Sequence, residues 1–300
     1  MKVATEPTPR VTRRGPAVIY LAYHPAAEDL AYVRSLARTT DVIAVSNSGD
    51  HDFGPDLLGK RIFAQNVGVG AGYNAGLAVA RSVGSSHVLF HDQDSRLHDA
   101  TLSEALKRLS EIDATGTEAV LSLSPVDLTT RQARSARLTH PVLKDGLLHY
   151  QDVQFSGLLA PVALFPDDSP FSEYLFVDFV DTEWCWRVSP TVRIVRDPAL
   201  TIGHHLGSGT RSLLGHDYSL PQPTRFFFQT RNLVVLTRVP YVPRRWPWQT
   251  TAKFLIRAAL LPFVERRFVE CWKQSILGFR AGLADRRAFA DTMMPTPLAR

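Results

Sequence analysis

Short apolar runs alternate with segments of helical periodicity in the first half of the chain. Strands are predicted at 17–22, 42–45, 61–65, 87–90 and 119–123, and helices at 27–38, 71–83 and 102–112. This alternation is typical of an α/β fold whose mostly parallel sheet is covered by helices. Such sheets bind ligands beyond the carboxyl ends of their strands, so the polar segments 46–50, 66–74 and 92–95 are expected to share one crevice.

The second half of the chain is less regular. Strands are expected within 153–164 and at 192–195, a helix over 223–239, and a long excursion over 125–150. The composition then shifts after two prolines near position 240. We therefore expect a disordered N-terminus (1–15), a main domain (16–240) and a C-terminal helical extension (241–300).

The overall composition is that of an ordinary globular protein, with 45% hydrophobic and 21% charged residues. Neither of the two cysteines belongs to a C-x-x-C pair, which argues against a disulfide framework or a structural zinc site. The chain begins without a secretory signal and contains no run of 18 apolar residues. We therefore expect a cytoplasmic protein.

Positive charge is concentrated near the C-terminus. The net charge is +5, but residues 244–300 contain eleven Lys and Arg against four Asp and Glu, which leaves +7 here and −2 elsewhere. Seven large aromatic residues are interleaved with these charges: Trp246, Trp248, Phe254, Phe263, Phe268, Trp272 and Phe279. This pattern fits an amphipathic surface on anionic lipid or a helical hairpin packed on the main domain, and nucleic acid is the least expected partner.

Asp92-Gln93-Asp94-Ser95 directly follows the apolar run 87–90. Two carboxylates two positions apart at the end of a buried strand repel each other unless a cation or a polar partner offsets their charge. Oxygen ligands of this kind suit Mg²⁺ or Mn²⁺, which often retain waters and bind a substrate diphosphate. The structural alternative is that one Asp caps the following helix and the other closes a turn.

The segment from Asn66 to Gly76 contains four glycines and opens a predicted helix. Glycines permit positive φ and close approach of a ligand, and a helix N-terminus favours an anion. The spacing differs from the dinucleotide-binding fingerprint, because no suitable acidic residue follows. A glycine-rich turn that only packs a helix against a strand is the alternative.

Residues 176–187 are dense in acidic and aromatic side chains. Asp178 and Asp181 can share one helix face, and a carboxylate beside aromatic rings can serve as a general base if its pKa is raised by desolvation. The alternative is that one of these two Asp residues caps a helix while Arg187 forms a local ion pair with Glu183.

The pair His204-His205 is expected in a flexible loop that follows a strand. A neutral imidazole can complete a metal site begun by a carboxylate, although a loop histidine is more often solvated or hydrogen-bonded. Arg211, Arg225 and Arg231 could bind a diphosphate through their fork geometry, or they could be exposed helix arginines.

In their order along residues 17–238, these segments resemble the inverting family 2 glycosyltransferases of the GT-A fold, and within them the bacterial rhamnosyltransferases that build surface polysaccharides. The matching motifs are N-x-G-x-G-x-x-x-N-x-G at 66–76, D-Q-D-S at 92–95, F-x-D-x-x-D-x-E-W-C-x-R at 176–187, H-x-L-G at 204–207 and aromatic-x-x-R-N at 228–232. The resemblance implies a Rossmann-like, mixed, mostly parallel sheet covered by helices, here with a basic and aromatic helical extension.

The resemblance also implies a role for each matching position. Asp94 and His204 would bind Mg²⁺ or Mn²⁺, with His205 as the fallback ligand, and Asp181 would be the general base. Donor contacts would come from Ser46, Asn47, Ser48, Asn66, Gly70, Asn74, Asp92, Gln93 and Arg231, with Asp92 on the ribose or a metal-bound water. Acceptor contacts would come from Gly157, Asp178, Glu183 and Trp184. The turn at 46–49 lacks the first Asp that is usual in the family, and Phe226–Phe228 lacks the usual Tyr hydroxyl.

The implied reaction is sugar transfer with inversion from a nucleotide-diphospho-sugar, expected to be dTDP-L-rhamnose, to a hydroxyl of a glycan or lipid-linked glycan. The implied partners include an anionic membrane surface at residues 241–300, which would place the protein at the inner face of the cytoplasmic membrane. A UDP-galactofuranose or UDP-glucose donor is an alternative. A nucleotidyltransferase is another, although the expected triphosphate-binding Lys/Arg segment is missing after the first strand. A non-catalytic membrane or assembly adaptor would need none of Asp94, Asp181 and His204.

Overall fold

The computed structural model describes residues 15–98, 100–114, 116, 118–128, 142–165, 170–204, 210–213, 216–219 and 221–293. The chain forms two compact units. The first contains the residues up to Tyr174 and the segment Thr191–His205, and the second contains Leu175–Pro190 and the residues from Leu206 onward. The sequence-based boundary at 240 therefore falls inside the second unit. Of the N-terminus expected to be disordered (1–15), residues 1–14 lie outside the described residues.

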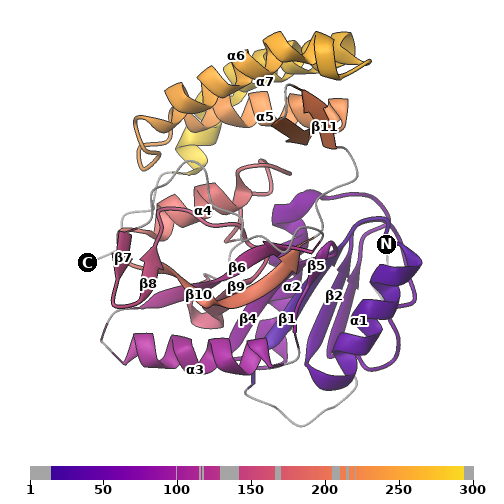
Figure 1. Cartoon of the computed structure of the whole chain (residues 1–300), viewed down its shortest axis with the longest axis vertical. Helices are drawn as coiled ribbons and strands as arrows, with labels where there is room; N and C mark the ends of the chain where they lie inside the picture. The colour runs from indigo at the N-terminus through magenta and orange to yellow at the C-terminus, as the bar shows by residue number, and fades with distance from the viewer. Residues whose placement is uncertain are drawn as a thin grey trace. The chain divides into compact units, whose positions relative to one another are not determined.

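The first unit is an α/β unit built around one large sheet (Figure 1). Its elements are β1 (Ala17–Ala22), α1 (Ala27–Thr39), β2 (Val42–Ser46), β3 (Gly59–Ile62), α2 (Gly68–Ser82), β4 (His87–Asp92), β5 (Ser95–Arg96), α3 (Thr101–Asp113), β6 (Ala119–Asp127), β7 (Val142–Lys144), β8 (Leu147–His149), β9 (Leu158–Pro161), the 3₁₀ turn Val162–Leu164 and β10 (Arg193–His204). The strand order is β3-β2-β1-β4-β9-β6-β10-β8-β7, and β5 pairs with β10.

Most of the longer strands run in one direction. The neighbours β3, β2, β1 and β4 are parallel, and so are β6 and β10. β9 is antiparallel to both β4 and β6, so the strands on either side of it share one direction. The short strands β5 and β8 each pair antiparallel with β10, and β7 pairs antiparallel with β8. The carboxyl ends of β1, β2, β4, β6 and β10 thus lie along the same edge, as the predicted parallel sheet requires.

Successive residues of β1 point to opposite faces of the sheet. Val18 and Tyr20 join buried side chains of α1 and α3 in one apolar cluster. Ile19 faces α2 on the other side, where a Cβ added to Gly76 would come within 2.4 Å of its Cγ2. Helices therefore cover both faces, and glycine lets α2 lie directly on the sheet.

The second unit is mainly helical. It contains α4 (Val180–Val188), the hairpin β11 (Thr210–Leu213) and β12 (His216–Ser219), and the helices α5 (Pro223–Leu236), α6 (Trp246–Val264) and α7 (Phe268–Thr292) (Figure 1). α5 and α7 approach to backbone contact, because a Cβ on Gly278 would lie 2.2 Å from the carbonyl oxygen of Phe227. The helical extension predicted after residue 240 is confirmed over α6 and α7. Across the described ranges, each helix falls short of the length or apolarity that crossing a bilayer requires.

Four predicted elements differ clearly from the structure. The irregular excursion expected over 125–150 contains, among its described residues, the end of β6 and the strands β7 and β8. The third strand is Gly59–Ile62 instead of 61–65, and α2 begins at Gly68 instead of residue 71. The strand predicted at 192–195 continues to His204, because a bulge between Asp197 and Thr201 lets pairing with β6 resume. The expectation that His204 lies in a flexible loop was therefore wrong.

Candidate active site

The polar segments that follow β2 and β4 meet the start of α2. The Nδ2 of Asn47, after β2, donates to the carbonyl of Gly68 at 2.9 Å. The hydroxyl of Tyr73 on α2 donates to Oδ1 of Asp92 at 2.6 Å, at the end of β4. The polar segments that were predicted to share one crevice therefore lie side by side at one edge of the sheet in the first unit.

Asp94 and His204 lie side by side at these strand ends. Nδ1 of His204 is 3.5 Å from Oδ1 of Asp94 and 3.0 Å from the hydroxyl of Ser95. Strand pairing fixes this arrangement, because Ser95 is the register partner of His204 in the β5–β10 ladder. The Oδ1 atom of Asp94 is buried and accepts no hydrogen bond from any described residue. A buried carboxylate oxygen beside an imidazole is the environment that a cation would complete.

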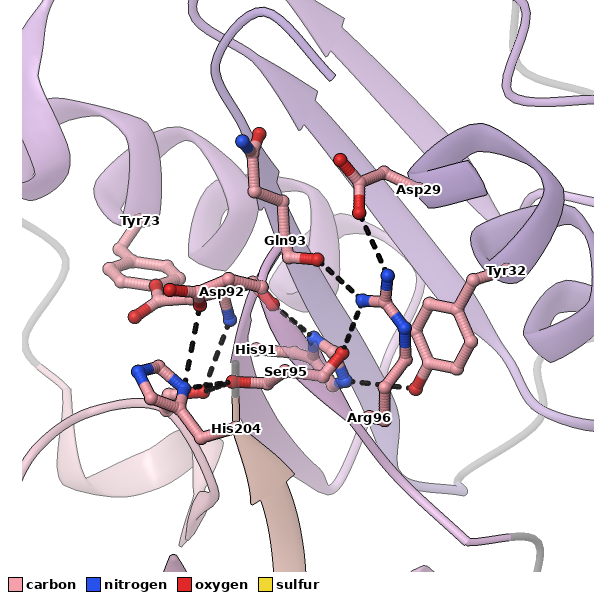
Figure 2. A network of polar contacts seen from close by, with 11 residues as sticks. Asp29, Tyr32, Tyr73, His91, Asp92, Gln93, Ser95, Arg96 and His204 are labelled. Carbon is pink, nitrogen blue, oxygen red and sulfur yellow. Dashed lines mark hydrogen bonds and ion pairs between the residues drawn. The ribbon is translucent and has the colours of Figure 1, made fainter. Parts of the chain in front are cut away.

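A polar network holds the loop that carries Asp94 (Figure 2). His91, wholly buried, contacts the carbonyl of Asp92 at 2.8 Å and the hydroxyl of Tyr32 at 3.0 Å. The guanidinium of Arg96 donates to Asp29 at 2.9 Å and lies over the Tyr32 ring at 4.5 Å. Burial lowers the pKa of His91 to about 4, so this imidazole is neutral at pH 7 and acts as a structural hydrogen-bonding group.

The described residues supply two metal-ligand side chains at this position. Among them, no group of three or more His, Cys, Asp and Glu side chains could hold a metal ion. Asp94 and His204 would therefore leave the remaining positions to waters or to a ligand, as is usual for Mg²⁺. The fallback ligand His205 lies outside the described residues.

Three of the predicted donor-binding side chains make local hydrogen bonds at the strand ends. Ser46 donates to the carbonyl of Gly49 at 2.6 Å. Ser48 Oγ accepts from the backbone amide of His24 at 2.7 Å, and Gln93 Oε1 accepts from that of Tyr23 at 2.6 Å. These bonds tie the ends of β1, β2 and β4 together.

Asn47 differs from these residues, because its Oδ1 is buried and has no hydrogen-bond partner among the described residues. The side chain as a whole is 3% exposed, and its Nδ2 is already bound to Gly68. Asn47 Oδ1 and Asp94 Oδ1 are thus two buried oxygens at these strand ends that accept no hydrogen bond from the described residues. Both point to polar groups of a ligand rather than to internal packing.

The glycine-rich segment is explained largely by packing. A Cβ on Gly70 would lie 2.6 Å from the carbonyl oxygen of Ser172, so Gly70 is required by close contact within the first unit. Asn66 Oδ1 accepts from the amide of Gly68 at 2.9 Å at the start of α2. Asn74 bonds both the amide and the carbonyl of Phe171, at 3.0 and 2.9 Å. The structural alternative thus accounts for these three predicted donor-binding residues.

Gly157 likewise has a structural explanation. Its φ is +85°, and an added Cβ would approach Ile202 at 3.0 Å and Leu123 at 3.2 Å. The residue is buried, and its carbonyl accepts from the amide of Leu123 at 2.8 Å. The backbone conformation and the available space therefore require glycine at this position.

In the second unit, the segment before α4 has an unusual backbone. Phe176, Asp178 and Phe179 all have positive φ, at 63°, 59° and 67°. Asn232 of α5 is wholly buried and holds this segment: its Nδ2 lies 2.8 Å from the carbonyl oxygens of Leu175 and Val177 and 3.0 Å from that of Asp178. Strained backbone of this kind persists only where its surroundings over-determine it, and it clusters at functional sites.

Asp178 lies outside α4, so it shares no helix face with Asp181, and that prediction was wrong. Its carboxylate accepts two hydrogen bonds of 2.9 Å from the guanidinium of Arg225 and one of 3.3 Å from Gln229. The helix N-cap is Phe179, with no side-chain capping bond, so neither Asp caps the helix. Asp178 instead anchors the strained segment to α5.

The first turn of α4 carries Asp181, which is half-buried. Its Oδ1 accepts from the amide of Thr182 at 2.8 Å. Glu183 is wholly buried, forms the predicted ion pair with Arg187 at 2.8 Å, and also accepts a very short hydrogen bond from the hydroxyl of Tyr241. The structural alternative for Glu183 is thus confirmed. Trp184 is wholly buried as well, so neither side chain has surface with which to contact an acceptor in this conformation.

Arg231 lies against neighbouring groups of α5. Its guanidinium donates to Asn232 Oδ1 at 3.0 and 2.9 Å and lies over the ring of Phe228 at 5.0 Å. These contacts orient the amide of Asn232, so that its Nδ2 faces the strained carbonyls. The position predicted to bind the donor is therefore engaged within the second unit.

The sequence analysis assigned no role to three residues whose side chains support the candidate site: His91, Asn232 and Tyr73. His91 and Asn232 lie inside the matched motifs, next to residues with an assigned role, so their position in the motifs could have identified them. Tyr73 lies within the glycine-rich segment and could have been considered as a partner for Asp92.

A mostly parallel α/β unit with a carboxylate and an imidazole at its strand ends is compatible with a Rossmann-like glycosyltransferase fold. No protein-family model matches the chain. The chain is similar to the dTDP-rhamnosyl transferase RfbF of Shigella flexneri, with 25% identity over 247 residues that cover 73% of this chain and 76% of that protein. This similarity over most of both chains supports a glycosyltransferase.

Proposed function

We propose that this protein is a metal-dependent, inverting family 2 glycosyltransferase of the GT-A fold. Its donor would be dTDP-L-rhamnose, and its acceptor a hydroxyl of a glycan or lipid-linked glycan in surface polysaccharide synthesis. The observation that carries the proposal is the buried, unbonded Oδ1 of Asp94 beside His204 at the strand ends. The similarity to a dTDP-rhamnosyl transferase supports the choice of donor.

The residues at the strand ends fit a divalent cation. Asp94 offers an oxygen without a hydrogen-bond donor among the described residues, and His204 offers an imidazole 3.5 Å away. When bound, Mg²⁺ or Mn²⁺ would neutralise the leaving diphosphate. Asn47 Oδ1 would accept a hydrogen bond from the nucleotide, since it is the second buried acceptor without a partner among the described residues at these strand ends.

Asp181 is the proposed general base. Its carboxylate would remove the proton of the acceptor hydroxyl while that oxygen attacks the anomeric carbon and the bond to the diphosphate breaks. The proton ends on Asp181, the nucleoside diphosphate leaves, and one displacement inverts the anomeric centre. Asn232 and Asp178 would orient Asp181 by fixing the segment that leads into α4.

We also propose that residues 241–300 rest on the inner face of the cytoplasmic membrane. α6 carries Lys253 and Arg257 without an acidic residue, and α6 and α7 together expose ten large hydrophobic side chains. Basic residues next to exposed apolar side chains suit an anionic lipid surface.

A thermal-shift panel tests the proposal. Purified protein is heated with dTDP, dTDP-L-rhamnose, UDP-glucose or UDP-galactofuranose, each with and without Mn²⁺ or Mg²⁺. We expect a metal-dependent rise with the dTDP ligands, because a ligand that binds only the folded state stabilises it. Asp94→Asn should lose the metal dependence, whereas the exposed control Asp56→Asn should keep it. A rise with UDP-sugars alone would change the donor, and no rise with any ligand would refute the site.

Transfer itself is tested with Asp181→Asn. The variant should show the same thermal shift with donor as the wild type and almost no transfer of rhamnose to acceptor. Normal turnover by Asp181→Asn would exclude Asp181 as the base. Metal-dependent donor binding by the wild type with no transfer to any acceptor would instead favour the adaptor.

A further inference from the structure

An apolar cavity of about 540 Å³ lies among α5, α6 and α7. Leu233 and Val234 of α5, Phe254 and Ala258 of α6 and Phe279 of α7 contribute to its wall. Its volume falls within the range of pockets that hold small molecules, about 300–1,000 Å³. All lining residues belong to the second unit, so the cavity is a property of that unit alone.

The way α6 is attached explains the cavity. α6 is attached near both ends: Trp246 packs edge-on against Phe179 and Trp186, Leu261 packs in a cluster with Phe226 and Cys271, and the carbonyl of Ala258 accepts from the indole of Trp272 at 3.0 Å. Along α5 and α7, in contrast, the backbones touch. Protein interiors leave few voids larger than a water molecule, so a space of this size is more typical of a binding site than of packing.

The mouth of the cavity is apolar and open to solvent. Leu255, Phe279 and Leu283 line the cavity and are 66%, 48% and 40% exposed. Of the fourteen large hydrophobic side chains exposed in the described part of the chain, ten are on α6 and α7. The cavity therefore opens onto the most apolar surface of the second unit. Contiguous surfaces of this kind are typical of lipid or protein contact sites.

Two arginines, Arg257 and Arg286, line the same cavity. The ion pairs recorded within the described part of this unit are Arg187–Glu183, Arg225–Asp178, Arg267–Glu265 and Lys273–Glu270, and none involves them. Arg257 donates to the neutral amide of Gln229 at 2.8 Å. Burial lowers the pKa of Arg257, and Arg225 lowers it further, while Asp178 raises it. A half-buried cation without a directly paired carboxylate favours an anionic ligand.

A cavity lined by apolar side chains and two arginines suits a ligand that has both a narrow apolar chain and an anionic headgroup. Guanidinium groups bind phosphate through two parallel hydrogen bonds. We propose that the cavity binds one acyl chain of an anionic phospholipid, with the phosphate held by Arg257 and Arg286. This inference rests on the proposed membrane association and adds a specific lipid site to it.

A single-chain lipid below its critical micelle concentration tests the site without a membrane. Full-length protein is titrated with lysophosphatidylglycerol in a calorimeter, and native mass spectrometry counts the bound molecules. We expect saturable binding of one lipid per chain. Lysophosphatidylcholine, with the same chain and a zwitterionic head, should bind at least tenfold more weakly, and glycerol phosphate without a chain should bind too weakly to detect. Equal binding of the two lysolipids would overturn the role of the arginines.

Matched variants locate the lipid in the cavity. Arg286→Ala and Arg257→Ala should each weaken lysophosphatidylglycerol binding about tenfold, which corresponds to about 1.4 kcal/mol. The exposed control Arg280→Ala on α7 should bind as the wild type does. Ala258→Trp fills the cavity and should abolish binding, whereas Ala259→Trp, on the exposed side of α6, should not. Melting temperatures of all variants confirm that they are folded.

The outcomes separate this inference from the proposed function. The nucleotide thermal-shift panel is repeated on the same protein samples. Lipid binding without any nucleotide shift would refute the donor site and keep the lipid site, and the reverse result would refute the lipid site alone. Lipid binding that Ala258→Trp leaves unchanged, or binding to phosphatidylglycerol vesicles without any binding of monomeric lysolipid, would overturn the cavity site and leave a surface contact.

Discussion

Replacing Asn232 by alanine removes the side chain whose hydrogen bonds hold the strained segment before α4; we call these bonds the Asn232 clamp. In the wild type, the Nδ2 of Asn232 serves the carbonyls of Leu175, Val177 and Asp178, and its Oδ1 accepts from Arg231. Alanine deletes all of these bonds and leaves three carbonyls to find other donors. We expect Asn232→Ala to be among the most destabilising single changes in the second unit.

The magnitude follows from the bonds that are lost. The Nδ2 group has two N–H donors for its three carbonyl contacts, so about 2 kcal/mol of net hydrogen bonding is lost, and leaving the buried carbonyl of Leu175 without a donor adds about 1 kcal/mol. The two bonds from Arg231 add little, because that half-exposed guanidinium can turn to solvent. The better helix propensity of alanine offsets about 0.5 kcal/mol. The expected loss is therefore about 2–3 kcal/mol, a large part of a typical stability of about 5–15 kcal/mol.

Thermal unfolding followed by circular dichroism measures this effect. A loss of 1 kcal/mol lowers the Tm of a domain of 150–250 residues by about 2–4 °C, so Asn232→Ala should melt about 4–12 °C lower than the wild type. The control is Gln274→Ala on α7, whose amide makes a single hydrogen bond with Glu270. The control should melt within about 2 °C of the wild type.

The same variant also tests whether the clamp orients Asp181. At a temperature where Asn232→Ala remains folded, its kcat should fall at least tenfold while its donor-induced thermal shift stays that of the wild type, because the proposed donor-binding residues Asn47 and Asp94 belong to the first unit. A Tm equal to that of Gln274→Ala would refute the energetic argument. A normal kcat in a destabilised variant would refute the orienting role and leave the clamp purely structural.

Three further predictions concern other parts of the chain. Burial lowers the pKa of His91 to about 4, so the unfolded chain binds a proton near pH 6.5 that the folded chain excludes. Stability from this group is therefore complete above pH 6.5 and lost as the pH falls toward 4, by about 3 kcal/mol in all. His91→Gln should flatten that region of a plot of urea midpoint against pH, and an unchanged slope would contradict the assignment. Gly278→Ala should lower the Tm by several degrees, because its Cβ would meet the backbone oxygen of Phe227 at 2.2 Å, whereas Gly15→Ala, with open space around it, should be neutral. Asp94→Asn should make any transferase activity insensitive to added Mn²⁺ or a chelator; an activity that still responds would move the metal site elsewhere.

The central strands could be predicted because they are buried on both faces. β1, β2 and β4 are continuous apolar runs between turn residues, and such runs are recognisable without any knowledge of their neighbours. The third strand was misplaced because β3 is short, polar and half-exposed at the sheet edge. β10 was cut short because Pro198 stands at its bulge, and only the pairing with β6 shows that the strand resumes.

The sequence predicted the location of the candidate site at the strand ends, but it did not predict which residues contact each other there. Parallel strand ends brought Asn47, Asp92 and the start of α2 together as expected. Sequence spacing could not show that Gly70 is fixed by the carbonyl of Ser172, or that Asn74 binds Phe171, since these contacts join segments about a hundred residues apart. Positive φ at three non-glycine residues before α4 is also invisible in a sequence pattern, because it is imposed by tertiary bonds.

The pairing of β5 with the end of β10 sets when the candidate metal pair can exist during folding. Ser95 and His204 are 109 positions apart, so the loop between them must close before the imidazole reaches the strand ends. Contacts of such long range form late, because their loop-closure entropy must be overcome first. A cation at Asp94 and His204 would therefore bind only chains whose sheet is complete. It would lower the unfolding rate of the folded unit and leave its folding rate unchanged, so that the ion would increase the kinetic stability of the native sheet.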